Sequence, residues 1–216
     1  MAYDFDKIAR TYDRLNRMMT LGLDRRWRKR AVKGLQGNVL DVACGTGDMM
    51  VELAKLGCNV TGVDISEEML EIARQKVKAA NFQLANAEAL PFAEGKFDAV
   101  TCAFGVRNFV HLEKGLGEML RVLKPGGRLL ILELATPDSK LIRPFYSFYT
   151  KRIIPWLGSR IAGNRDAYTY LPNSIARFPK GDAFLKIVHH SSLNTHHCKE
   201  RKLTFGVCRL YSIEKS

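Results

Sequence analysis

The chain has 216 residues, 46% of them hydrophobic, and 34 Lys and Arg side chains against 22 Asp and Glu give a net charge of +12. This length suits one α/β domain with additional segments, and no apolar stretch is long enough to cross a bilayer. The five cysteines are scattered without a Cys-x-x-Cys pair, which argues against a disulfide framework and is typical of a cytoplasmic protein with reduced thiols.

The positive charge is concentrated toward the two ends of the chain. Residues 31–138 contain 11 Lys and Arg against 14 Asp and Glu, so the excess of basic side chains lies in residues 1–30 and 139–216. Most exposed Lys and Arg are simply solvated. Basic flanks also suit an anionic partner, which is either nucleic acid or a membrane leaflet.

In chain order, two N-terminal helices are expected, over residues 4–20 and 23–34. Strands and helices then alternate. The expected strands are 39–42, 59–63, 82–85, 99–104 and 128–134. The helices between them are 48–56, one capped by Ser66 that runs through Val77, and 112–122, which Lys124-Pro-Gly-Gly127 ends. This alternation predicts an α/β fold with a parallel sheet and right-handed crossovers.

The pattern changes after residue 138. Residues 141–157 mix aromatic, aliphatic and basic side chains, and Pro144 and Pro155 are expected to limit a helix between them. This segment either packs on the core or forms a lid over an apolar substrate and touches a membrane interface. Residues 201–211 alternate well enough for two final strands, which would complete a seven-stranded, mostly parallel sheet with an antiparallel edge.

Four of the five histidines lie in residues 188–198. His189 and His196 are spaced to share a helix face, with Cys198 close by. Ser, Asn and Thr disfavour helix here, however, and no carboxylate or second cysteine stands at ligand spacing. We therefore expect a surface loop and no metal site.

The most informative motif is the glycine turn that follows the first strand. An apolar run containing Asp41 leads into Gly45-Thr46-Gly47, and a second apolar run ends at Asp64. Glycine lets a ligand lie against bare backbone, and an acid at the second strand end can accept hydrogen bonds from two ribose hydroxyls. The third glycine of the dinucleotide pattern G-x-G-x-x-G is missing. Asp41, Gly45–Gly47 and Asp64 thus resemble the S-adenosylmethionine site of class I methyltransferases; a dinucleotide fold with a shortened loop is the alternative.

Ligands of open parallel sheets bind at the carboxyl ends of the strands. This rule gathers the segments that follow the first, second, third and fourth strands around one crevice. These are Cys44–Gly47, Asp64, Asn86-Ala87 and Ala103–Asn108.

Longer motifs resemble the ubiquinone/menaquinone biosynthesis C-methyltransferases over most of the chain. They are Phe5-Asp-Lys-Ile-Ala-Arg-Thr-Tyr-Asp-Arg-Leu-Asn16, Gly22-Leu-Asp-Arg-Arg-Trp27, Asn86-Ala-Glu-Ala-Leu-Pro-Phe92, Phe104-Gly-Val-Arg-Asn108, Arg121-Val-Leu-Lys-Pro-Gly-Gly127 and Tyr170-Leu-Pro-Asn-Ser-Ile175. The resemblance implies that Thr46, Asp64, Asn86 and Ala87 contact S-adenosylmethionine. A further contact, often a serine, falls on Ala103 in this chain, whose side chain cannot form a hydrogen bond.

The resemblance also implies methyl transfer from S-adenosylmethionine to a ring carbon of a polyprenyl naphthoquinol, with a benzoquinol as the alternative. The ring carbon becomes nucleophilic when its neighbouring hydroxyl loses a proton, and a donor at that oxygen would stabilise the phenolate. Arg107 and Asn108 are placed for this role, and Arg107 is too basic to accept a proton. The proton acceptor is expected to be Asp13, Tyr12 or a bound water. The structural alternatives are a surface ion pair for Arg107 and a helix-surface pair for Tyr12 and Asp13.

We expect a single methyltransferase domain over residues 1–216. It divides into an N-terminal helical segment (1–34), a cofactor-binding core (35–138), a lid or substrate segment (139–185) and C-terminal edge strands (186–216). The expected location is cytoplasmic, with peripheral contact at the anionic inner face of a membrane. The oligomeric state, including a homodimer, stays open.

Two competing functions differ in the partner they require. A nucleic-acid substrate is not expected, because Phe104-Gly-Val-Arg stands where amino-group methyltransferases typically have an Asn/Asp-Pro-Pro-Tyr-like motif. A non-catalytic protein that binds S-adenosylmethionine or carries lipid is the other alternative.

Overall fold

The computed structural model describes residues 9–154, 172–191 and 195–216. Its seven-stranded sheet has the order β3-β2-β1-β4-β5-β7-β6. The strands are β1 (Asn38–Val42), β2 (Asn59–Asp64), β3 (Asn81–Leu84), β4 (Phe97–Ala103), β5 (Leu123–Leu134), β6 (Thr195–Leu203) and β7 (Cys208–Lys215). β1 to β5 pair in parallel, whereas β7 runs antiparallel to both β5 and β6. The predicted α/β fold with a seven-stranded, mostly parallel sheet is confirmed.

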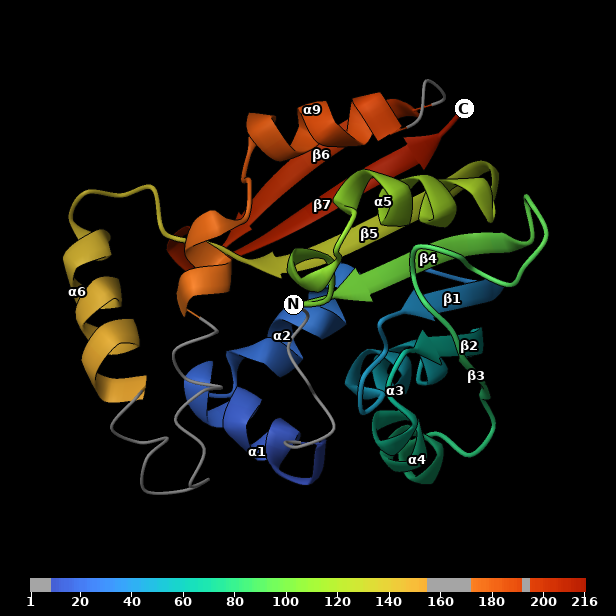
Figure 1. The fold of residues 1–216 in the computed structure, drawn as a ribbon, viewed down its shortest axis with the longest axis horizontal. Helices are drawn as coiled ribbons and strands as arrows, with labels where there is room; N and C mark the ends of the chain where they lie inside the picture. The colour runs from blue at the N-terminus through green and yellow to red at the C-terminus, as the bar shows by residue number, and fades with distance from the viewer. Residues whose placement is uncertain (1–8, 155–171, 192–194) are drawn as a thin grey trace.

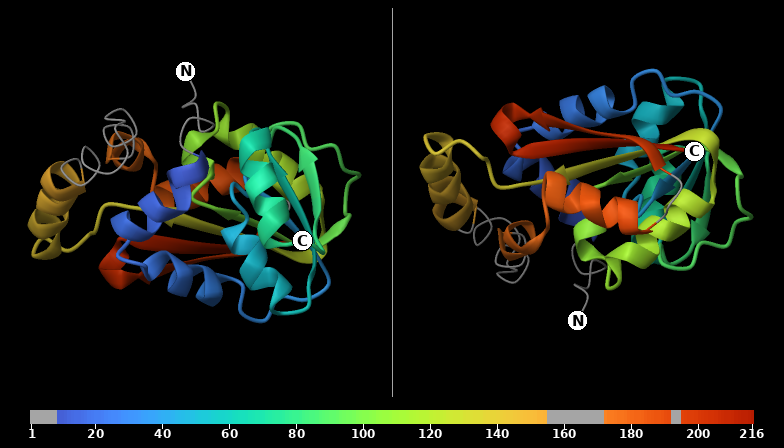
Figure 2. Two further views of the ribbon diagram at one scale, coloured as in Figure 1. Left: turned by 90° about the horizontal axis from the view of Figure 1, so that it is seen from below. Right: turned by 90° about the horizontal axis from the view of Figure 1, so that it is seen from above.

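Helices cover both faces of the sheet (Figure 1 and Figure 2). α5 (Leu112–Arg121) and α9 (Asp182–Ser191) lie on one face, and α2 (Leu23–Ala31), α3 (Asp48–Ala54) and α4 (Glu67–Lys76) lie on the other. Side chains along a strand alternate between the two faces. In β1, Leu40 and Val42 pack with α5 and α9, while Val39 packs with α2 and α3. The strands are therefore apolar on both faces, as expected for a parallel sheet covered by helices.

Several short elements lie beyond the carboxyl ends of the parallel strands, where a ligand is expected. They are α1 (Ala9–Met19), the 3-10 turn η2 (Val106–Asn108), α6 (Ile142–Phe148) with its continuation as the π-helical turn η3 (Tyr149–Ile153), a helical turn over 172–177, and the turn η4 (Thr204–Gly206). Parts of the predicted first helix, of the 141–157 segment and of the Tyr170–Ile175 motif lie outside the described residues. Within the described residues, no helix is long and apolar enough to cross a membrane.

The prediction of a surface loop at 188–198 is wrong. Residues up to Ser191 belong to α9, and β6 begins at Thr195. α9 forms despite its polar end because Phe184 and Val188 are fully buried against the sheet and α5; tertiary packing overrides weak helix propensity. His189 and His196 therefore lie on different elements and do not share a helix face.

Pro144 lies within a helix rather than at its limit, whereas α5 does end at Arg121, just before Lys124-Pro-Gly-Gly127, as predicted. α6 begins at Ile142, so Pro144 lies within its first turn, where no backbone N–H is required. The Lys124–Gly127 segment is part of β5, and the pairing with β4 shifts register between Phe97 and Ala99, opposite this segment. A bulge of this kind accommodates proline and glycine within a strand.

Candidate active site

The glycine turn after β1 has the backbone conformation that its sequence requires. Gly45 and Gly47 have φ values of 53° and 82°, and Gly47 precedes α3 as its N-cap. A Cβ at Gly47 would lie 3.0 Å from the Cβ of Ala73 in α4, closer than the packing allows. Side chains are thus excluded by both conformation and space, which leaves bare backbone beside the ends of β1 and β2.

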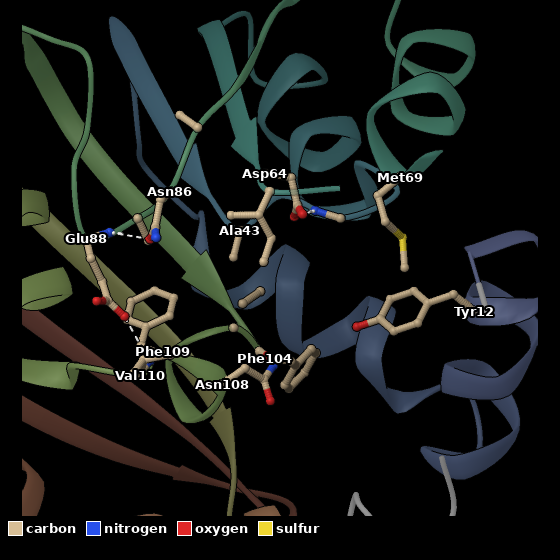
Figure 3. A pocket seen from close by; sticks show the side chains of 16 residues that line it. Tyr12, Ala43, Asp64, Met69, Asn86, Glu88, Phe104, Asn108, Phe109 and Val110 are labelled. Atoms are coloured by element: carbon tan, nitrogen blue, oxygen red, sulfur yellow. Dashed lines mark hydrogen bonds between the residues drawn. The ribbon is translucent and has the colours of Figure 1, made fainter. Parts of the chain in front are cut away.

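A cavity of about 120 Å³ opens at the carboxyl ends of β1, β2 and β4 (Figure 3). Its walls come from α1, the glycine turn, the segments after β2, β3 and β4, and α4. Predicted site residues in its lining are Tyr12, Gly45, Asp64, Asn86, Ala87, Ala103 and Asn108. Phe104 and Gly105, which belong to the predicted segment Ala103–Asn108, line it too. Residues that were not predicted from the sequence are Ala43, Ile65, Met69, Ala85, Glu88, Phe109 and Val110. The strand-end rule thus located the cavity, whereas much of its apolar lining was missed.

Asp64 is held in place by the backbone around it. Its Oδ2 accepts from the Gly45 N–H at 2.8 Å, and its Oδ1 accepts from the Ser66 N–H at 3.1 Å. Two backbone donors fix the carboxylate at the tip of β2, facing the cavity as shown in Figure 3. This is the placement that a ribose-binding acid requires.

Asp41 lies beneath the glycine turn, with 1% of its surface exposed. Its Oδ1 accepts from the Thr101 hydroxyl at 2.6 Å, and its Oδ2 is buried with no hydrogen-bond partner within the described residues. Burial raises the pKa of Asp41 to about 7, although the hydrogen bond from Thr101 and the charge of Arg28 act to lower it. A small cavity of about 20 Å³, lined also by Arg28 and Thr46, adjoins it. A buried acceptor without a partner suits a donor group of a bound ligand.

A polar network joins α1 to the glycine turn. The Thr46 hydroxyl donates to Asp13 at 2.5 Å, and Lys76 of α4 donates to both Asp13 and Asp48. Both carboxylate oxygens of Asp13 are therefore engaged, and Asp13 is not among the residues that line the cavity. Burial acts to raise the pKa of Asp48, but the hydrogen bond and charge of Lys76 outweigh it, so the pKa is lowered. Asp13 ties α1 to the turn in this structure.

Tyr12 is the proton-acceptor candidate that reaches the cavity. Its ring lies over the glycine turn, and its hydroxyl points into the space between Asp64 and Asn108 (Figure 3). A Cβ placed on Gly45 would be 4.0 Å from the Tyr12 ring. The two neighbours Tyr12 and Asp13 thus have different surroundings, one facing the cavity and the other facing Lys76.

Arg107 and Asn108, which are neighbours in η2, also have different surroundings. The Arg107 guanidinium donates to the buried carboxylate of Glu133 at 2.6 Å and to the Phe104 carbonyl at 2.5 Å. The Arg107 side chain is only 6% exposed and that of Glu133 is not exposed, so this is a buried ion pair rather than a surface one. Arg107 lines a neighbouring cavity of about 460 Å³, and Asn108 lines both cavities.

Phe104 marks the boundary of the site on the β4 side. It has a φ of 61°, which is unusual for a bulky residue and is found most often at functional positions. Its ring lies 4.9 Å from the guanidinium carbon of Arg28 and contacts Trp27 edge-on at 6.4 Å between centroids. Arg28 is in turn paired with the buried Asp24 at 2.7 Å. α2 thus supports the strained residue from behind.

Two charged residues shape the site without having been selected from the sequence. Glu88 accepts from the N–H groups of Val110 and His111, at 2.8 and 2.9 Å, and so holds the loop that forms one wall of the cavity (Figure 3). Glu133 pairs with Arg107. A signal existed for Glu133, because it is the single acid in the apolar run at the carboxyl end of β5.

The matches to known proteins agree with this geometry. The model of the ubiE/COQ5 methyltransferase family matches residues 2–215. The chain belongs to the ubiE/COQ5 methyltransferase family. Membership confirms the predicted family and the enzyme class, and with it S-adenosylmethionine as the methyl donor. The bare glycine turn, the fixed Asp64 and the unpartnered Asp41 oxygen fit this donor.

Individual relatives cover nearly the whole chain. A demethylmenaquinone methyltransferase from Bacteroides fragilis is 41% identical over 98% of this chain and 90% of its own length. A ubiquinone/menaquinone biosynthesis C-methyltransferase from Geobacter sulfurreducens is 43% identical over 98% of this chain and 86% of its own length. Among solved structures, a SAM-dependent methyltransferase from Thermotoga maritima is 21% identical with a TM-score of 0.71, and covers 98% of both chains. This last likeness shows the shared fold.

Proposed function

We propose that this ubiE/COQ5 family member methylates a ring carbon of a polyprenyl quinol, with demethylmenaquinol as the substrate and menaquinol as the product. The observation that carries the proposal is the match over 98% of the chain to a relative named for demethylmenaquinone methylation. A benzoquinol of the ubiquinone pathway is the second candidate, because the relative from Geobacter sulfurreducens is named for both pathways.

The geometry supports a ring site beside Phe104–Asn108. Asn108 lines both the cofactor cavity and the neighbouring cavity, so an acceptor that contacts Asn108 from the second cavity lies next to the cofactor. Asn173 and Ser174, which belong to the Tyr170–Ile175 motif, line that second cavity too. The fold thus brings Asn173 and Ser174, which are distant in sequence from Asn108, to the same cavity.

The residues of this chain have to bind and orient the two substrates and stabilise the developing phenolate. S-adenosylmethionine supplies a methyl group that its sulfonium has already activated, so alignment and exclusion of water account for much of the catalysis. We assign Asn108 as a donor to the developing phenolate oxygen and Arg107 as a positive charge close behind it. Arg107 also fixes the Phe104 carbonyl. The proton that the hydroxyl beside the ring carbon loses passes to Tyr12 or to a bound water, because the oxygens of Asp13 are engaged by Thr46 and Lys76. After methyl transfer, the hydrogen on the methylated ring carbon moves to that oxygen and restores the quinol.

The direct test incubates the protein with labelled S-adenosylmethionine and a short-chain demethylnaphthoquinol, and in parallel with the corresponding benzoquinol. We expect label in the naphthoquinol product. Asp64→Ala serves as the matched control, because it removes the strand-end acid and should abolish cofactor binding. Absence of label from both products with the unaltered protein would contradict the proposal.

We also propose that the enzyme meets its lipid substrate at the cytoplasmic face of an anionic membrane. α6 and the residue before it expose Leu141, Phe145 and Phe148, at 82%, 78% and 62% of their surface. Spacings of four and three residues place them on one side of the helix, and the basic residues Lys140 and Arg143 are close to them in the sequence. Exposed aromatic side chains beside basic ones are typical of interfacial helices.

Vesicle sedimentation tests this proposal. Binding to vesicles with anionic lipid should exceed binding to neutral vesicles and weaken with salt, and Phe145→Ser with Phe148→Ser should reduce it. Equal binding to both vesicle types would contradict it. Sedimentation velocity of the free protein separately tests whether it forms a homodimer.

A further inference from the structure

Another cavity, which is mainly apolar, is lined by residues of the α1–α2 turn, α6, η3 and η4. These elements lie toward one end of the molecule (Figure 2). The volume of the cavity is about 190 Å³. An enclosed apolar cavity of about 150 Å³ binds small hydrocarbons, so this volume is large enough for an aliphatic group. The apolar lining of the cavity includes Leu23, Trp27, Leu134, Ile154, Ile175 and Val207. By size and lining, this cavity suits a hydrocarbon.

Several polar groups of the lining already have hydrogen-bond partners in the protein. The Tyr149 hydroxyl donates to the Met18 carbonyl at 3.1 Å, and Trp27 Nε1 donates to the Thr204 hydroxyl at 2.9 Å. These contacts leave the aromatic rings available for apolar contact. A ligand with many hydrogen-bonding groups would find few partners here, whereas an aliphatic chain would need none.

This cavity adjoins the cofactor site at one aromatic contact. Trp27 lines the apolar cavity, Phe104 lines the cofactor cavity, and their rings contact edge to face. Tyr146 also lines the apolar cavity, and burial raises its pKa to about 12, while the positive charge of Arg107 acts to lower it. Through the contact of Trp27 with Phe104, the cavity adjoins the first residue of the segment assigned to the quinol ring.

The cavity also reaches the protein surface. Leu21 lines the cavity and is largely exposed, so it stands at the mouth. Phe205, next to the lining residue Thr204, is also largely exposed, and both have positive φ values, of 56° and 44°. The mouth is therefore bordered by apolar side chains on two separate turns. A chain leaving the cavity would continue over hydrocarbon rather than directly into water.

We propose that this cavity binds the isoprenoid chain of the substrate at the units next to the ring, while the ring itself lies at Phe104–Asn108. The inference rests on the proposed function and adds a defined site for the lipid tail. The tail is then recognised by the protein, and is not merely the part of the substrate that remains in the bilayer.

The test compares kcat/KM for a naphthoquinol carrying a short prenyl chain with kcat/KM for the same ring without one. Val207→Phe fills the cavity from its wall; Val207 has helical φ and ψ of −65° and −31°, which phenylalanine adopts without strain. Leu84→Phe, at an exposed position on β3, is the matched control. The unaltered enzyme and Leu84→Phe should prefer the prenylated substrate by about tenfold or more, as is usual when apolar groups are added in a fitted pocket. Val207→Phe should remove most of that preference.

The outcomes separate the two proposals. Label in neither substrate with the unaltered enzyme contradicts the proposed function. Equal kcat/KM for both substrates leaves that function standing and overturns the tail site, as does a Val207→Phe variant that keeps the full preference. If Val207→Phe fails to fold, Leu134→Phe fills the same cavity from β5, and the preference of the unaltered enzyme remains a test in itself.

Discussion

Mutations of the buried ion pair between Arg107 and Glu133 can distinguish an effect on stability from an effect on turnover. Replacing Arg107 with Met keeps much of the side chain's volume but leaves the Glu133 carboxylate buried without its cation. Removing one partner of a buried pair costs about 3 to 5 kcal/mol. For a protein of this size, a change of 1 kcal/mol shifts Tm by about 2 to 4 °C, so we expect Tm to fall by about 6 to 20 °C.

The double variant Arg107→Met with Glu133→Gln should recover most of that loss, because the buried charge is gone. Turnover should not recover, since neither variant restores the positive charge beside the ring site. Thermal melting gives the first comparison, and single-turnover kinetics with calorimetric titration of S-adenosylmethionine give the second. We expect cofactor affinity to change far less than turnover in both variants. A double variant that regains turnover, or an equal fall in affinity and turnover for Arg107→Met, would refute the assigned role.

Three further predictions follow from single contacts. Gly47→Ala should lower stability by about 1 to 3 kcal/mol, because it forces a side chain into a left-handed conformation, and should weaken cofactor binding; unchanged melting would contradict this. Asp41 has a folded pKa near 7, well above its unfolded value, so its contribution to stability falls as pH rises from about 4 to 7, by about 1.4 kcal/mol per unit. Asp41→Asn should remove that slope in urea unfolding without cofactor, whereas parallel profiles of the two proteins would disprove it. Glu88→Gln should weaken the acceptor shared by the Val110 and His111 amides and speed their hydrogen exchange, and unchanged exchange would show that Glu88 does not hold the loop.

Local features of the sequence predicted the sheet and the cofactor turn. The glycine turn and Asp64 could be recognised because each requirement is set within a few residues by backbone conformation and by the end of a strand. Contacts between distant residues left no such signal. Lys76 meets Asp13 across 63 positions, and nothing near either residue in the sequence indicates the other.

The wrong prediction at 188–198 has a related cause. Local composition favoured a loop, but burial of Phe184 and Val188 decided the outcome. Sequence patterns also gave no sign of the apolar cavity that α6 helps to line, because its lining residues come from five separate stretches of the chain: 16–27, 134, 146–154, 172–175 and 204–207. What the sequence indicated was only that residues 141–157 were suited to an apolar partner.

The contact between Asp13, Thr46 and Lys76 makes the docking of α1 part of the cofactor equilibrium. Anything that stabilises the glycine turn in its binding conformation also stabilises α1 against it, and thermodynamic linkage makes this effect reciprocal. S-adenosylmethionine should therefore protect α1 from proteolysis, and cutting or destabilising α1 should weaken cofactor binding by the same free energy. The affinity for S-adenosylmethionine therefore reports how stably α1 is docked on the glycine turn.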